Sequence, residues 1–145
     1  MPSATLHIPP HLRSLDLAGA LAYVQKKLDD IQAVYLFGSA KDVLHKDSDI
    51  DLAILTDHPL TSTQRWALQE DLAAILHRDV DLVDLRSAST VMQVQVVAKG
   101  FVLYEADTLA RQRFEMHAYA RYAALNEERA AILNDIQQRG RVYGG

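Results

Sequence analysis

The chain has 145 residues, of which 49% are hydrophobic and 23% charged, with a formal net charge of −4 and no cysteine. This length and apolar content predict one globular domain with its own core, and the missing cysteines exclude disulfides and thiolate metal sites. The acidic balance argues against direct nucleic-acid binding, which needs a basic surface. No apolar run approaches the ~20 residues of a membrane span, and the first residues lack the layout of a signal peptide. We therefore expect a cytoplasmic protein without membrane contact.

The chain divides into a short N-terminal region and one longer region. Residues 1–13 contain three prolines and are expected to form a flexible N-terminal arm. Residues 14–145 are expected to form a single domain. Within it, Ser14 can cap a first helix whose apolar stripe runs from Leu17 to Leu28.

The remaining elements follow from hydrophobic periodicity and from turn residues. Strands are expected at 33–37, 50–55, 80–85 and 101–104, and helices at 61–77, 90–99 and 107–139. The segment 90–99 is ambiguous because its valines favour a strand, but a serine cap before it and Gly100 after it favour a helix. The last helix spans ~50 Å at about 1.5 Å per residue, too long for so small a core to cover. The predicted class is α/β, with a small mixed β-sheet flanked by helices and a long C-terminal helix.

The most informative stretch joins the first two of these strands. An apolar strand ends at Phe37 and runs into Gly38 and Ser39, a polar loop follows, and the next strand opens with Asp49 and Asp51. Side chains alternate along a strand, so both aspartates project from one face. Neighbouring carboxylates repel unless a cation lies between them, and Mg²⁺ prefers oxygen ligands shared with substrate phosphates. Because glycine lets the backbone turn close to a phosphate, this combination predicts a site for a metal-bound nucleoside triphosphate.

This stretch resembles the nucleotidyltransferase superfamily that includes DNA polymerase β, and more closely its minimal, single-domain members. The resemblance implies that Gly38 and Ser39 hold the triphosphate of ATP and that Asp49 and Asp51 bind Mg²⁺. It also implies that a third carboxylate on a later strand completes the metal site and acts as a base toward the acceptor hydroxyl. The family pattern places this third acid on Asp81.

Two other acids lie near Asp81 in the sequence. Asp79 falls on the same predicted face and is the alternative third acid, whereas Asp84 falls on the opposite face and is expected to be structural. A strand with three acids can also be an edge strand that charge protects from pairing. The role of Asp81 therefore rests on the family pattern.

The loop between Ser39 and Asp49 departs from the family pattern. It has nine residues, one fewer than is usual, and contains no glycine. We expect Asp42 or Asp47 to take the left-handed conformation that a glycine would otherwise supply.

A second resemblance covers the stretch from Val80 to Val91 and continues to Gly100. It is similar to the antitoxin branch of the family, found in HEPN–MNT toxin–antitoxin pairs. This implies an enzyme that transfers AMP from ATP to a tyrosine of a HEPN-domain ribonuclease toxin within a hetero-oligomeric complex. Two alternatives stay open. The chain could neutralise the toxin by binding alone, which the short loop favours, or it could modify a small molecule, which its single-domain length disfavours.

Three further residues allow two interpretations each. Lys41 and Lys46 lie in the loop and are expected to be solvated, although they can also neutralise phosphate. Trp66, on the second predicted helix, is expected to pack at the margin of the core or to stack on a base.

Overall fold

The computed structural model describes residues 4–143. Within them, one sheet has the strand order β1-β5-β2-β3-β4, in which β3 and β4 are parallel and all other neighbours antiparallel. The strands are β1 (Thr5–Leu6), β2 (Ile31–Phe37), β3 (Ile50–Thr56), β4 (Val80–Asp84) and β5 (Phe101–Glu105). The α-helices are α1 (Leu17–Lys27), α2 (Ser62–Leu76), α3 (Thr90–Lys99) and α4 (Thr108–Tyr143). The predicted α/β class with a small mixed sheet is confirmed, as is the helix expected at 90–99.

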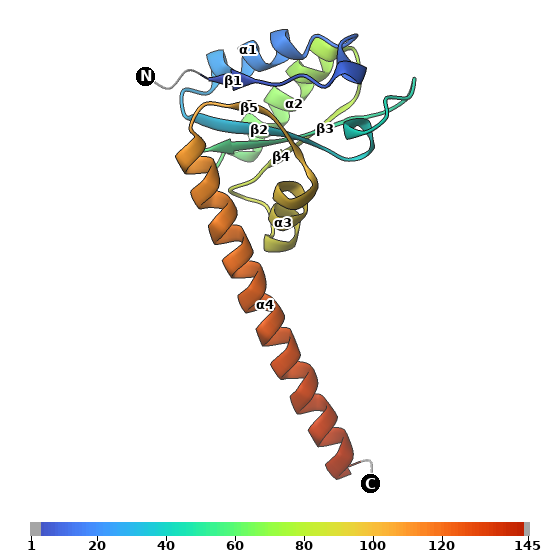
Figure 1. The fold of residues 1–145 in the computed structure, drawn as a ribbon, viewed down its shortest axis with the longest axis vertical. Helices are drawn as coiled ribbons and strands as arrows, with labels where there is room; N and C mark the ends of the chain where they lie inside the picture. Colours follow the sequence, from blue (N-terminus) through green and yellow to red (C-terminus); the bar gives the residue numbers. More distant parts are fainter. Residues whose placement is uncertain (1–3, 144–145) are drawn as a thin grey trace.

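Helices cover both faces of the sheet (Figure 1). On one face, buried residues of α1 and α2 pack with Leu36, Leu52 and Ile54 of the central strands. On the other face, α3 and the first turns of α4 pack with Tyr35 and Ala53. The uninterrupted apolar run of β3 therefore reflects a strand that is buried on both faces.

The N-terminal segment differs from the flexible arm expected for residues 1–13, of which 1–3 lie outside the described residues. Strand β1 pairs with β5, and a short 3-10 helix, η1 (Pro10–Leu12), follows. Leu12 is fully buried, and Nε2 of His11 lies 2.9 Å from the carbonyl oxygen of Ala40. Two of the prolines that suggested a loose arm, Pro9 and Pro10, instead fix the backbone before η1 and at its first position. This segment therefore braces the turn that follows β2.

Side-chain caps define where the helices begin. Asp16, rather than Ser14, caps α1 by accepting a hydrogen bond of 3.0 Å from the amide of Gly19. Thr61 and Ser89 cap α2 and α3, and Asp107 caps α4. Each cap satisfies amide groups that have no partner inside the helix.

Helix α4 is held by the domain over its first turns only. Phe114 is buried against the sheet, and Glu115 accepts hydrogen bonds from the hydroxyl of Tyr35 at 3.0 Å and from Arg111 at 2.8 Å. Burial, and then the negative charge of Glu115, raises the pKa of Tyr35, so that its hydroxyl stays a neutral donor. Residues 126–140 are all exposed, and the helix projects away from the domain (Figure 1).

None of the helices in this described part of the chain combines the length and the apolar character needed to cross a membrane.

The buried Leu12 provides a test of whether the N-terminal segment belongs to the folded domain. We expect Leu12→Ala to lower the free energy of unfolding by about 2–5 kcal/mol, because it removes a fully buried side chain from the core. Urea denaturation measures this loss. Leu6→Ala is the matched control, since Leu6 is 42% exposed, and it should cost less than about 1 kcal/mol. Equal, small losses for both variants would show that the segment frays from the core.

Candidate active site

Strand pairing brings two of the predicted site aspartates together. Asp51 of β3 and Asp81 of β4 are direct partners in the parallel ladder, and residues opposite one another share a face of the sheet. Their neighbours Ala53 and Val83 pack on the side of α3 and α4, so the two aspartates project from that face. Asp49 immediately precedes β3. Asp49 and Asp81 are exposed, whereas Asp51 is half-buried.

Asp51 lies within range of the negative charges of the other two site aspartates. Burial raises the pKa of Asp51, and the negative charges of Asp81 and then Asp49 raise it further. Among residues 4–143, no three acidic or histidine side chains form a ready-made metal site. Asp49, Asp51 and Asp81 nevertheless offer carboxylate oxygens alone. Their oxygen-only donor set suits Mg²⁺, which would relieve the repulsion that raises the pKa of Asp51.

Gly38 lies directly against this group. The antiparallel pairing of β2 with β3 places Phe37 opposite Asp51, and the backbone then turns at Gly38 with φ of 76°. This left-handed region favours glycine, and a Cβ atom at this position would collide with the carboxylate of Asp51. Gly38 and Ser39 are both exposed. A phosphate that contacts these two residues would therefore lie beside Asp51.

The loop between Ser39 and Asp49 turns without a left-handed residue. The expectation that Asp42 or Asp47 would take this conformation is wrong, because His77 is the non-glycine residue with positive φ in the described chain. A 3-10 helix, η2 (Ser39–Lys41), makes the first turn. The second turn is closed at residues 45–48, where the hydroxyl of Ser48 accepts a hydrogen bond of 2.8 Å from an amide. Ordinary right-handed backbone is thus sufficient when side chains support the loop.

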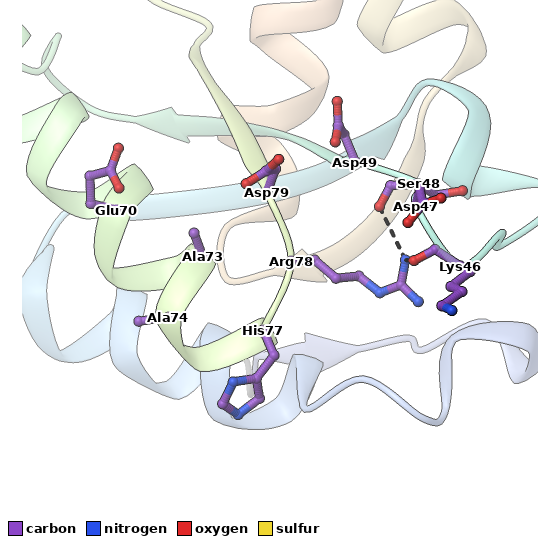
Figure 2. Close-up of a pocket in the computed structure, with 10 residues that line it drawn as sticks. All are labelled: Lys46, Asp47, Ser48, Asp49, Glu70, Ala73, Ala74, His77, Arg78 and Asp79. Carbon is purple, nitrogen blue, oxygen red and sulfur yellow. Dashed lines mark hydrogen bonds between the residues drawn. The ribbon is translucent and has the colours of Figure 1, made fainter.

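Arg78 supplies most of that support and was not recognised from the sequence. Its Nη1 atom donates hydrogen bonds to the carbonyl oxygens of His45 at 2.8 Å, Lys46 at 3.2 Å and Ser48 at 3.1 Å. Figure 2 shows its side chain reaching toward this segment from the residues that precede β4. Arg78 therefore ties the segment before Asp49 to the segment before Asp81. No sequence motif marks such a residue, because its acceptors are backbone atoms of a distant segment.

The two other acids near Asp81 have different environments. Asp84 is buried and accepts hydrogen bonds from the amide of Leu60 at 2.8 Å and the hydroxyl of Ser87 at 2.9 Å, which confirms a structural role. Asp79 is exposed and precedes β4. Together with Asp49, its side chain lines a cavity of about 600 Å³ beside the end of α2 (Figure 2).

A second cavity, of about 400 Å³, opens at Gly38 on the side of α3. It is lined by Phe37, Gly38, Lys41, Asp42, Met92, Gln95 and Lys99. Lys41 is half-buried and makes an ion pair of 3.8 Å with Asp42. The two lysines give this cavity cations next to the glycine turn, as phosphate binding requires. Lys99 was not recognised from the sequence, in which its place at the end of the helix before β5 is its only signal.

Comparisons with known proteins show which family this chain resembles. The family model of polymerase β nucleotidyltransferases matches residues 20–109. Protein adenylyltransferase MntA of Shewanella oneidensis is 40% identical over 114 residues, which are 78% of this chain and 81% of that protein.

Two solved structures extend the similarity. A toxin–antitoxin structure with AMP-PNP has a chain that is 38% identical, with a TM-score of 0.75, covering 85% of this chain and 99% of that one. A complex of tri-AMPylated Shewanella oneidensis HEPN toxin with MNT antitoxin has a chain that is 37% identical, with a TM-score of 0.69, covering 83% of this chain and 94% of that one. The chain therefore belongs to the polymerase β nucleotidyltransferase family, among the relatives of MntA.

Proposed function

We propose that this chain is an antitoxin that transfers AMP from ATP to a tyrosine of a HEPN-domain ribonuclease toxin. The observation that carries the proposal is the placement of Asp51 beside Asp81 and against Gly38. The similarity to an adenylyltransferase, and to an antitoxin solved with an AMPylated HEPN toxin, supports the reaction and the partner. The sequence predicted a cytoplasmic protein, and the use of ATP fits a reaction in the cytoplasm.

The divalent cation belongs to this proposal. Asp49, Asp51 and Asp81 would hold Mg²⁺, and their mutual repulsion fits a group of ligands for a divalent cation. Bound Mg²⁺ neutralises charge on the phosphates and withdraws electrons from phosphorus.

The protein's own groups act on the two substrates. The exposed turn at Gly38 and Ser39 orients the β- and γ-phosphates, while Lys41 and Lys99 neutralise part of their charge. Asp81 accepts the proton of the acceptor tyrosine, whose ordinary pKa of about 10 leaves its hydroxyl neutral near pH 7. The phenolic oxygen forms a bond to the α-phosphorus as the bond to the bridging oxygen breaks, and pyrophosphate leaves. Positioning and charge neutralisation supply most of the rate.

Intact-mass spectrometry of a HEPN partner incubated with the protein, ATP and Mg²⁺ tests this function. We expect mass additions of AMP on the partner, together with a loss of its ribonuclease activity. Both effects should disappear in Asp49→Ala/Asp51→Ala, and chelation with EDTA should stop the mass additions, because the phosphates then lose their cation. A partner that is inhibited but unmodified would instead establish neutralisation by binding alone.

The choice between Asp81 and Asp79 as the third acid can be decided by two isosteric variants. Asp81→Asn should lower kcat for AMP transfer by about 10²–10⁴-fold, as expected for loss of a general base. Asp79→Asn should change kcat by less than about tenfold, because this residue is not the ladder partner of Asp51. The reverse result would move the base to Asp79.

A separate experiment tests whether Arg78 holds the loop before Asp49 in place. Arg78→Met keeps an unbranched apolar stem but removes the guanidinium group, and with it three hydrogen bonds to the loop before Asp49. We expect the Mg²⁺ concentration for half-maximal activity to rise by roughly tenfold or more, as for other residues that orient metal ligands. Arg113→Met, at an exposed position on α4, is the control and should leave this concentration unchanged. An unchanged Mg²⁺ requirement in Arg78→Met would show that the loop holds its shape without Arg78.

A further inference from the structure

Apart from Asp49, the residues that line the cavity beside the end of α2 have no role in holding ATP in the mechanism above. It measures about 600 Å³ and lies between α2 and residues 46–49 (Figure 2). Glu70, Ala73 and Ala74 form its wall on α2, and Asp79 approaches it from the segment before β4. The two alanines leave a wall without bulky side chains.

This cavity and the one at Gly38 adjoin the site aspartates from different sides. Asp49 lines the larger cavity, and Asp79 stands two residues before Asp81. The smaller cavity is lined partly by α3, which covers the opposite face of the sheet from α2. The two cavities share no lining residue. The larger cavity thus reaches the site at Asp49, and the smaller one reaches it at Gly38, which lies against Asp51.

The geometry of phosphoryl transfer assigns these two sides. The attacking and leaving oxygens lie roughly in line across the phosphorus atom. Because the turn at Gly38 and Ser39 holds the leaving pyrophosphate, the acceptor hydroxyl must approach from the side of the aspartates away from that turn. The larger cavity does not include that turn, and it is lined by Asp49 and by Asp79, which stands two residues before the proposed base Asp81.

The charge of the larger cavity favours a basic occupant. Four carboxylates line it, those of Asp47, Asp49, Glu70 and Asp79, against the two cations Lys46 and Arg78. The guanidinium of Arg78 is turned toward three backbone carbonyl groups. Such a cavity repels a triphosphate and attracts lysine or arginine side chains.

An exposed tryptophan extends this surface along α2. Trp66 lies four residues before Glu70, on the same face of the helix, and is 58% exposed, which corrects the expectation that it packs at the core margin. Exposed tryptophans beside clefts are typical of contacts with a protein partner. A surface that continues past the cavity along a helix fits a polypeptide better than a small molecule.

We propose that this cavity, together with Trp66, binds the polypeptide segment that carries the acceptor tyrosine and selects a segment with lysine or arginine beside it. The proposal rests on the proposed function and adds the acceptor site and its charge preference. Glu70 is the residue that tests it, since it lines the cavity and lies outside the metal site.

Binding of labelled tyrosine peptides to the protein loaded with Mg²⁺ and AMP-PNP measures this selectivity. The peptides carry arginine, glutamine or glutamate on both sides of the tyrosine, and fluorescence anisotropy gives each Kd. The arginine peptide should bind about three- to tenfold more tightly than the glutamate peptide, as expected for partly exposed charges. Glu70→Arg should abolish or reverse this preference, and Glu70→Gln should have an intermediate effect. Trp66→Ala should weaken the binding of all three peptides.

Two controls separate the possible outcomes. Asp29→Arg reverses an exposed charge in the turn between α1 and β2, away from the cavity, and should keep the wild-type preference. The affinity for AMP-PNP, measured by calorimetry, should be the same in Glu70→Arg and in the wild type. Altered AMP-PNP binding in Glu70→Arg would assign the cavity to the nucleotide, and equal or absent binding of the three peptides would also overturn the proposal. A failure of the proposed function has a different signature, namely a toxin that gains no AMP although the peptides bind.

Discussion

The in-register pairing of the parallel strands β3 and β4 is the constraint on which the site depends. It places Asp51 opposite Asp81, and a slip of one residue would turn Asp81 to the other face of the sheet. Apolar burial holds this register, because Ile50, Leu52 and Leu82 all lie in the core cluster under α1 and α2. The core thus maintains two neighbouring carboxylates, and burial, followed by the negative charge of Asp81, raises the pKa of Asp51.

Segments far apart in the sequence hold the backbone around this carboxylate pair, at the turn after β2 and in the loop before Asp49. Gly38 brings the backbone after β2 against Asp51, His11 contacts the following turn at Ala40, and Arg78 binds the carbonyl groups before Asp49. Backbone carbonyl groups accept these contacts from His11 and Arg78. The loop therefore needs no special backbone conformation of its own, and its missing glycine has little structural consequence.

The fold exposes two surfaces that can bind a partner protein. The projecting half of α4 exposes Ile132, Leu133 and Ile136, each by more than half, and α2 exposes Trp66 beside the acidic cavity. The candidate site is open to solvent as well, since Gly38, Asp49 and Asp81 are exposed. In the proposed function the partner itself completes the enclosure, so that recognition of the toxin and presentation of its tyrosine become one event.

The sequence by itself determined strands β2 to β5, the four α-helices and the turn at Gly38, and it predicts that Asp49 and Asp51 share one face. These features follow from local rules: periodicity, capping and the steric freedom of glycine. Tertiary structure decided that β1 pairs with β5, that Arg78 supports the loop, that Trp66 is exposed, and that an acidic cavity adjoins the site. Each of these depends on contacts between residues distant in the chain, and no local pattern encodes which distant groups a fold will bring together.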